Sequence, residues 1–115
     1  MTISISAEIR EAFSRLACKS DRHLRETARI FAYLRELETE LQEGRVSLDF
    51  WNIQDSASGW LESSFTLRTG TPIWRLYPQH RHVIALLARQ EGKIAVIQLC
   101  CRKDLEAVER ALSSA

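Results

Sequence analysis

The sequence predicts an α+β domain in which an N-terminal helical hairpin packs on a small antiparallel sheet of about four strands, followed by a short C-terminal helix. Apolar residues recur at helical spacing as far as Gly44, and beyond it they alternate with a period of two. Clusters of turn-forming residues divide this second half into short segments. With 115 residues, the chain is expected to form a single domain over residues 1–115.

Two helices are predicted before Gly44, which is a suitable terminator for the second. Ser6 can cap a helix that runs to about Cys18, and Ser20 or Asp21 can cap a longer one. The charged residues of the longer helix are interpreted as a solvated face. The apolar residues expected to face the sheet are Ile9, Ala12, Phe13 and Leu16 in the first helix and Leu24, Ala28, Phe31, Leu34 and Leu41 in the second, with Ile30 and Leu37 beside them.

Period-two alternation predicts the strands. A short opening strand is suggested at Ile3 and Ile5, and residues 48–53 are interpreted as a strand or a loop. The segment 82–89 is apolar on both faces, as expected of a central strand that is covered on two sides. We expect the hairpin to pack against Phe65, Leu76 and Leu86. The remaining predicted elements are strands at 60–68, 73–77 and 94–101 and a closing helix at 104–112, capped by Asp104.

Charge is distributed unevenly along the chain. The formal net charge is +1, but residues 68–103 carry seven Lys or Arg and one acid, Glu91. The first 67 residues carry eight cations and eleven acids, so the basic segment is flanked by acidic ones. If this segment folds as a sheet, several cations should share a face and attract a polyanion.

The composition argues against several classes of protein. No apolar run approaches the ~20 residues that span a bilayer, and Met1 to Ser6 lack the features of a secretory signal. We therefore expect a cytoplasmic protein that does not contact a membrane. Three cysteines without a C-x-x-C pair predict neither a disulfide scaffold nor a metal site.

The second half of the chain resembles the RelE/ParE superfamily of toxins from bacterial type II toxin–antitoxin pairs. Segment 60–68 is similar to the family strand that carries a basic residue, and segment 71–77 to the strand with an aromatic residue followed by arginine, here Trp74 and Arg75. Segments 82–89 and 93–99 are similar to the two closing strands, and Arg102 and Lys103 to the basic pair after them. The chain departs from the family in having Cys100-Cys101 where a glycine is frequent, and Asp104-Leu105-Glu106 where a tyrosine is frequent.

The resemblance implies a RelE-like fold and an endoribonuclease that cleaves mRNA with neither metal nor cofactor. Arginine binds phosphate through two N–H groups, and histidine transfers protons near neutral pH. Arg75 shares a strand face with Ile73, opposite Trp74, which directs it away from one hydrophobic layer. The residues implied for catalysis are Arg75, His82 and Arg102; those implied for RNA binding are Arg68, Arg75, Tyr77, His80, Arg102 and Lys103.

Two other functions are consistent with the same pattern. ParE-like members of the superfamily inhibit DNA gyrase by binding it, without hydrolysis. A degenerate member could act as an adaptor that binds protein or nucleic acid and cleaves nothing. His80 and His82 near Arg75 favour the nuclease, because gyrase binding needs no proton-transfer group. A toxin also implies a cognate antitoxin that covers the basic sheet or the hairpin.

Overall fold

The computed structural model describes residues 3–44, 60–76, 82–90 and 92–114, with the backbone alone for residues 60–64. The elements along the chain are β1 (Ile3–Ser4), α1 (Ala7–Ala17), α2 (Asp21–Gln42), β2 (Trp60–Thr66), β3 (Pro72–Leu76), β4 (Val83–Gln90), β5 (Lys93–Cys101), a 3-10 turn (Arg102–Asp104) and α3 (Leu105–Ser114).

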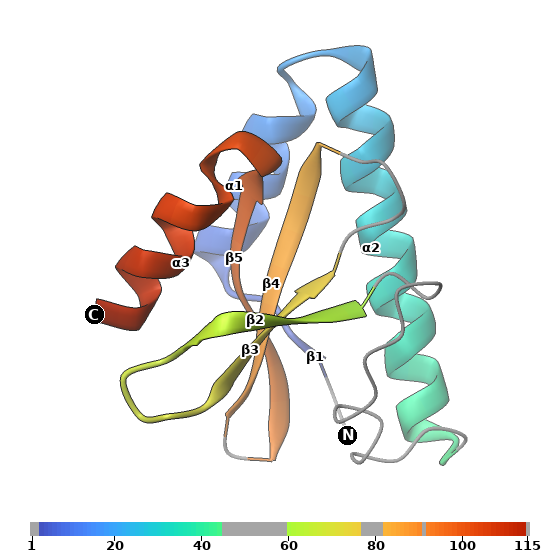
Figure 1. Ribbon diagram of the computed structural model, residues 1–115. Helices are drawn as coiled ribbons and strands as arrows, with labels where there is room; N and C mark the ends of the chain where they lie inside the picture. The colour runs from blue at the N-terminus through green and yellow to red at the C-terminus, as the bar shows by residue number, and fades with distance from the viewer. Residues whose placement is uncertain (1–2, 45–59, 77–81, 91, 115) are drawn as a thin grey trace.

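The strands form one sheet in the order β1-β5-β4-β3-β2 (Figure 1). Strands β2 to β5 form an antiparallel meander, whereas β1 pairs in parallel with β5, with Ile3 opposite Ile94. The α+β class is thus confirmed, as is the short opening strand. The prediction of about four antiparallel strands is corrected to a mixed sheet of five, because β1 joins the edge of the last strand instead of starting a separate hairpin.

Both helices of the hairpin begin at the predicted serines. The Oγ of Ser6 accepts a hydrogen bond from the backbone N–H of Ile9 at 3.2 Å, and that of Ser20 accepts one from His23 at 3.1 Å. Each serine thereby satisfies an N–H that lacks a partner in the first turn of a helix. Gly44 follows α2 with a φ of +73°, a conformation that favours glycine.

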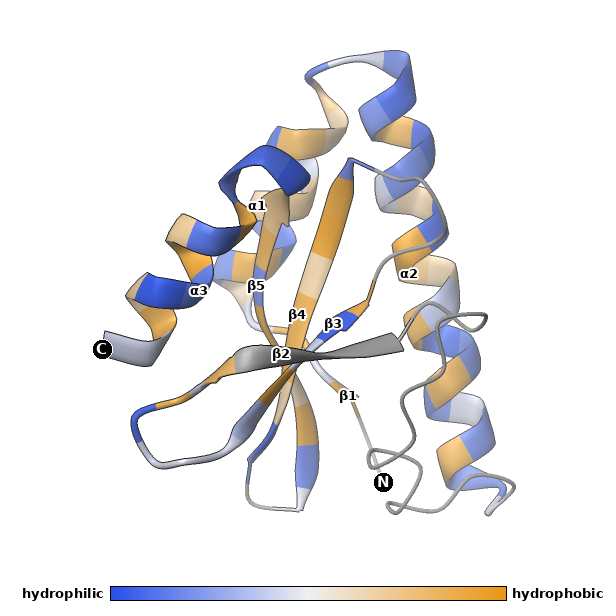
Figure 2. Ribbon diagram, in the orientation of Figure 1, coloured by the Kyte–Doolittle hydropathy of each residue, from blue (hydrophilic) through white to orange (hydrophobic). Residues whose placement is uncertain are grey.

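The sheet is covered on both faces. Helices α1 and α2 pack on one face, called here the first face, and α3 packs on the other, the second face (Figure 1). Strand β4 is hydrophobic along most of its length (Figure 2), and its residues 83–88 are all buried, which confirms a central strand covered on two sides. Val83, Ala85 and Leu87 contact the first layer, and Ile84 and Leu86 the second.

The buried stripe of α2 is rotated from the predicted one. Leu24 is 53% exposed, Ala28 is exposed, and Phe31 is half-buried, with its ring 4.8 Å from that of Phe13. The prediction placed the buried stripe on the side of Leu24, Ala28 and Phe31 because it counted apolar residues alone. The helix instead turns polar residues inward at its N-terminal end; its buried residues are Glu26, Thr27, Ile30, Leu34, Leu37 and Leu41.

Two of the three strand residues expected under the hairpin lie on the opposite face. Leu76 belongs to the first layer as predicted, but Phe65 and Leu86 contact the layer beneath α3. Because β4 is apolar on both faces, its sequence did not show which residues faced the hairpin. Residues 48–53 lie outside the described residues. No helix in the described part of the chain is long and apolar enough to cross a membrane.

Candidate functional site

The end of the sheet where β4 begins and β5 ends brings two of the predicted site residues together. Val83 pairs with Cys101 in the ladder, and one step further the backbone N–H of Arg102 donates to the carbonyl of His82 at 2.6 Å. Both residues are exposed, as is Lys103 in the 3-10 turn. This backbone hydrogen bond, one step beyond the end of the ladder, joins two exposed residues at the surface.

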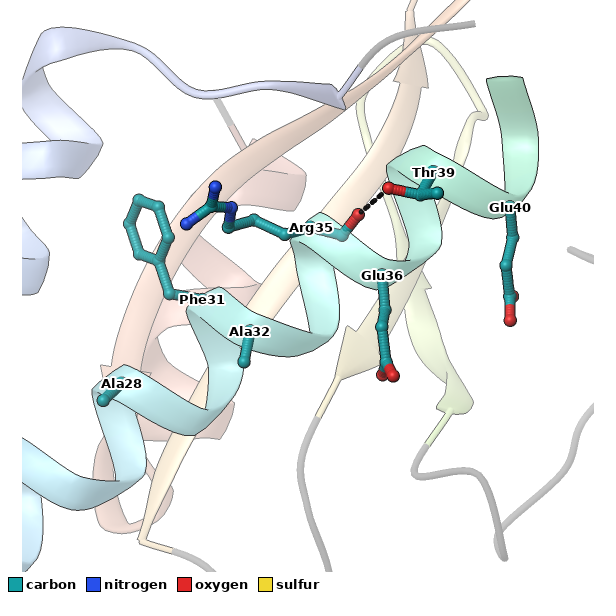
Figure 3. A pocket seen from close by; sticks show the side chains of 7 residues that line it. All are labelled: Ala28, Phe31, Ala32, Arg35, Glu36, Thr39 and Glu40. Carbon is teal, nitrogen blue, oxygen red and sulfur yellow. Dashed lines mark hydrogen bonds between the residues drawn. The ribbon is translucent and has the colours of Figure 1, made fainter. Parts of the chain in front are cut away.

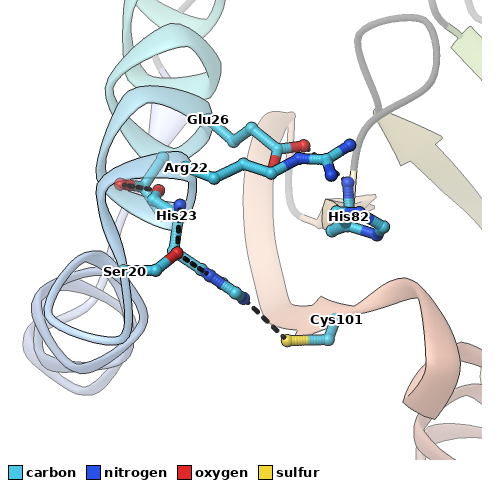
Figure 4. Close-up of polar contacts among 7 residues, drawn as sticks. Ser20, Arg22, His23, Glu26, His82 and Cys101 are labelled. Atoms are coloured by element: carbon cyan, nitrogen blue, oxygen red, sulfur yellow. Dashed lines mark hydrogen bonds and ion pairs between the residues drawn. The ribbon is translucent and has the colours of Figure 1, made fainter.

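The N-terminal half of α2 adds a buried carboxylate to this end of the sheet. Glu26 is only 1% exposed, and its Oε1 accepts the backbone N–H of His82 at 2.5 Å. The second oxygen, Oε2, lies 3.6 Å from the Nε of Arg22 and has no hydrogen-bond partner among the described residues. Since a buried carboxylate oxygen without a hydrogen bond is costly, Glu26 stands out from the solvated charges of α2. We call His82, Arg102, Arg22 and Glu26 the His82 corner; Figure 4 shows His82, Arg22 and Glu26.

Arg75 is held on the second face of the sheet. Its Nη2 donates to Glu109 Oε1 at 2.7 Å and its Nε donates to Oε2 at 3.2 Å, a bidentate pair that spans β3 and α3. Glu109 is fully buried, and the Arg75 side chain is 26% exposed. The expectation that Arg75 points away from the hairpin layer is confirmed, but the face it occupies is covered by α3.

The predicted site residues therefore do not form one cluster. Arg75 pairs across the sheet with Leu86, four positions along β4 from His82, or about 13 Å at the rise of a strand. Arg68 is exposed after β2 in the β2–β3 connection. Tyr77 and His80 lie outside the described residues.

Three residues of these contacts were missed by the sequence analysis: Arg22, Glu26 and Glu109. A helical projection gives a signal for the two acids. Glu26 lies four positions before Ile30 in the buried stripe of α2, and Glu109 lies four positions after Leu105, on the side of α3 that faces the sheet. An acid in such a stripe requires a partner.

A second polar chain lies beside the His82 corner. The Oγ of Ser20 contacts Nδ1 of His23 at 2.7 Å, and Nε2 of the same ring lies 3.9 Å from the Sγ of Cys101 (Figure 4). Cys101 is buried in the first layer. This chain fixes the His23 ring between α2 and β5. In the part of the chain that the structure describes, no three His, Cys, Asp or Glu residues gather to hold a metal ion.

The neighbouring Cys100 lies on the second face, where burial raises the pKa of its thiol to about 12; the negative charges of Cys101, Asp104 and Glu109 add to the rise, and Arg75 opposes it. In native protein treated with iodoacetamide at about pH 8, exposed Cys18 should be alkylated rapidly and Cys100 should stay unmodified, as mass spectrometry of peptides would show. In urea both should react. Equal native rates would contradict this. Because unfolded Cys100 ionises at the ordinary 9.0, its contribution to stability should fall as pH rises from there towards about 12.

A hollow of about 630 Å³ runs along the outer side of α2 (Figure 3). Of the lining residues that the structure describes, the charged ones are Arg35, Glu36 and Glu40, so acids outnumber cations among them. The hydroxyl of Thr39 donates to the carbonyl of Arg35 at 3.1 Å within the same helix. This hollow therefore lacks the positive charge that a polyanion requires, in contrast to the His82 corner.

Comparison of the chain with family models, with curated proteins and with solved structures finds no match.

Proposed function

We propose that the chain is the toxin of a bacterial type II toxin–antitoxin pair and that it acts in the cytoplasm as an endoribonuclease on mRNA, using the His82 corner. The proposal combines the resemblance to the RelE/ParE superfamily with the geometry at this end of the sheet. Its partners would be mRNA and a cognate antitoxin. The order of elements, a short strand, a helical hairpin and an antiparallel meander, agrees with that resemblance.

One observation carries the proposal: the hydrogen bond from Arg102 N–H to the His82 carbonyl, which joins the backbones of two exposed residues, one suited to proton transfer and one to phosphate binding. Arg22 and Lys103 add exposed cations. The carboxylate of Glu26 fixes the backbone of His82 from below. Such an arrangement on rigid elements is what general acid–base catalysis requires.

Each group has a role in strand cleavage. His82 would take the proton of the ribose 2′-hydroxyl, whose oxygen attacks phosphorus; as the bond from phosphorus to the 5′-oxygen breaks, protonated His82 would return a proton to that oxygen. Arg102, with Lys103, would bind the scissile phosphate and stabilise the charge that develops on its oxygens. Glu26 would act as a positioning residue. These steps use only protein side chains, so cleavage should persist in the presence of a chelator.

His82→Asn is expected to lower the cleavage rate by about 10²–10⁴-fold, the usual worth of a general acid or base, and to change RNA affinity little. Arg102→Gln should weaken RNA binding and reduce its salt dependence by about one phosphate contact. Assays of purified protein with labelled mRNA measure both the cleavage rate and the RNA affinity. In cells, expression without a partner should arrest growth, and His82→Asn should relieve the arrest. Arg29→Gln, which removes an exposed cation from α2, serves as the matched control.

The outcomes separate the three functions. RNA cleavage lost in His82→Asn and kept in Arg29→Gln supports the nuclease. Growth arrest with intact RNA and blocked supercoiling would assign the chain to the gyrase inhibitors. A folded protein that neither arrests growth nor cleaves RNA would leave the binding adaptor.

One observation favours the adaptor as a second candidate. Arg75, the arginine that the resemblance implies for phosphate binding, is already bound by both oxygens of Glu109 beneath α3. A nuclease that needed Arg75 would have to break this pair. The proposed mechanism therefore rests on His82 and Arg102 and assigns no catalytic step to Arg75.

A further inference from the structure

A pocket of about 680 Å³ lies at the hairpin ends of the sheet, away from the His82 corner. The pocket lies at the opposite end of the strands, where β4 turns into β5 and β2 into β3. The residues that line it come from β1, β4, β5 and the β2–β3 turn: Ser4, Leu67, Thr69, Thr71, Arg89, Gln90, Lys93 and Ala95.

The described residues that line this pocket carry positive charge and hydrogen-bond donors. Arg89 and Lys93 bring two positive charges, and Gln90 brings an amide. None of the lining residues in the described part of the chain is an Asp or a Glu. Hydroxyls of Ser4, Thr69 and Thr71 complete a set of hydrogen-bond donors. The two cations and the several neutral donors among the described lining residues complement a doubly charged oxyanion.

The β2–β3 turn holds its two threonines in place. The backbone N–H of Leu67 donates to the Thr71 carbonyl at 2.9 Å, and that of Gly70 donates to the Leu67 carbonyl at 2.8 Å. Gly70 has a φ of +87°, which favours glycine. The hydroxyls of Thr69 and Thr71 lie 2.9 Å apart. One of them donates to the other, so the second hydroxyl hydrogen of the pair is available to a ligand.

We propose that this pocket binds the phosphate group of a nucleotide-type ligand, with Arg89 and Lys93 neutralising its charge and Thr71 donating a hydrogen bond. Its volume falls within the roughly 300–1,000 Å³ of small-molecule sites, which suits a nucleoside phosphate. A phosphodiester of an RNA strand presents similar oxygens, and the experiment below separates these two sources.

The pocket is independent of the proposed nuclease site. Lys93 begins β5, and Arg102 follows its last residue, so the two cations lie about 30 Å apart at the rise of an extended strand. One phosphate cannot contact both. A failure of either proposal leaves the other intact.

Titration calorimetry of the full chain at low ionic strength tests the pocket, with adenosine triphosphate as the first probe and an oligouridylate as the second. The Arg89→Gln/Lys93→Gln double variant should lose at least about tenfold in affinity, because two charge-assisted hydrogen bonds are removed. Thr71→Val, which removes the hydroxyl and keeps the shape, should lose a few-fold. Arg15→Gln/Arg29→Gln, with the same loss of charge at exposed positions of α1 and α2, should bind nearly as the unaltered chain does.

The probes separate the ligand sources. Variant-sensitive binding of the triphosphate identifies a nucleotide site, and variant-sensitive binding of the oligouridylate alone identifies a nucleic-acid contact. Equal losses in both double variants, or no binding of either probe to the unaltered chain, would overturn the proposal. Far-ultraviolet circular dichroism confirms that each variant is folded. His82→Asn should bind the triphosphate unchanged, which keeps this result separate from RNA cleavage.

Discussion

Replacing Arg75 with Ala is expected to lower the free energy of unfolding by about 3–5 kcal/mol, the usual cost of removing one partner of a buried ion pair. The loss arises from Glu109, which is fully buried and accepts two hydrogen bonds from Arg75. Without the guanidinium its carboxylate would remain buried in the second layer and would lose both of these hydrogen bonds. Urea unfolding followed by circular dichroism measures the effect, provided that the slope with denaturant is unchanged.

Two controls test this explanation. Glu106→Ala breaks the exposed pair between Glu106 and Arg110 on the outer side of α3, and it should cost no more than about 0.5 kcal/mol. The double replacement Arg75→Met/Glu109→Leu removes both charges and should recover most of the stability lost in Arg75→Ala. A single Arg75→Ala variant as stable as Glu106→Ala would show that the buried pair contributes little.

This pair also determines how growth experiments must be interpreted. An Arg75 substitution that relieved growth arrest would by itself be ambiguous, because the variant would be partly unfolded as well as altered in charge. His82 and Arg102 are exposed and lie outside both buried layers, so their substitution changes the proposed chemistry without this loss of stability.

Leu34→Ala is expected to cost about 2–5 kcal/mol, whereas Leu24→Ala in the same helix should cost less than about 0.5 kcal/mol. Leu34 is 2% exposed in the first layer, and Leu24 is 53% exposed. The two replacements remove the same atoms from one helix, so the difference isolates burial from helix propensity. Thermal and urea unfolding of the pair measure it. A loss at Leu24 as large as that at Leu34 would contradict the observed rotation of α2.

The rotation of α2 shows where local sequence information stops. Serine caps are local signals, and both helices begin where Ser6 and Ser20 predict. The inward position of Glu26 depends on the backbone of His82, which lies just before β4 and far along the chain. A count of apolar residues within α2 does not include that hydrogen bond, so it favoured Leu24 over Glu26.

The face assignments of the strands failed for a related reason. In a strand that is buried on both faces, apolar and polar residues do not alternate. The sequence of β4 therefore did not show whether Leu86 faced the hairpin or the closing helix. In addition, the register of the β4–β5 ladder shifts between Leu86 and Leu87, which changes the pairing of the residues on either side. The sequence predicted α3 but not the face it covers, and that face determines the partner of Arg75.

The candidate site was predictable in part. His82 and Arg102 were named from residue chemistry and the resemblance, and strand pairing does bring them together. Arg75 was placed on the correct strand face, but its partner Glu109 comes from a helix whose docking the strand pattern did not show.

The parallel pairing of β1 with β5 has a consequence for how the chain folds during its synthesis. Ile3 and Ser4 are synthesised well before their partners Ile94 and Ala95, which lie far along the chain. The α1–α2 hairpin has only local contacts to form and can assemble early, whereas contacts between distant parts of a chain form slowly. Until β5 has been synthesised, the edge of the sheet that β1 occupies does not exist. Strand β1 can therefore join the sheet only after β5 has formed. A nascent chain that stops before β5 lacks both the β1–β5 pairing and the strand that leads to Arg102.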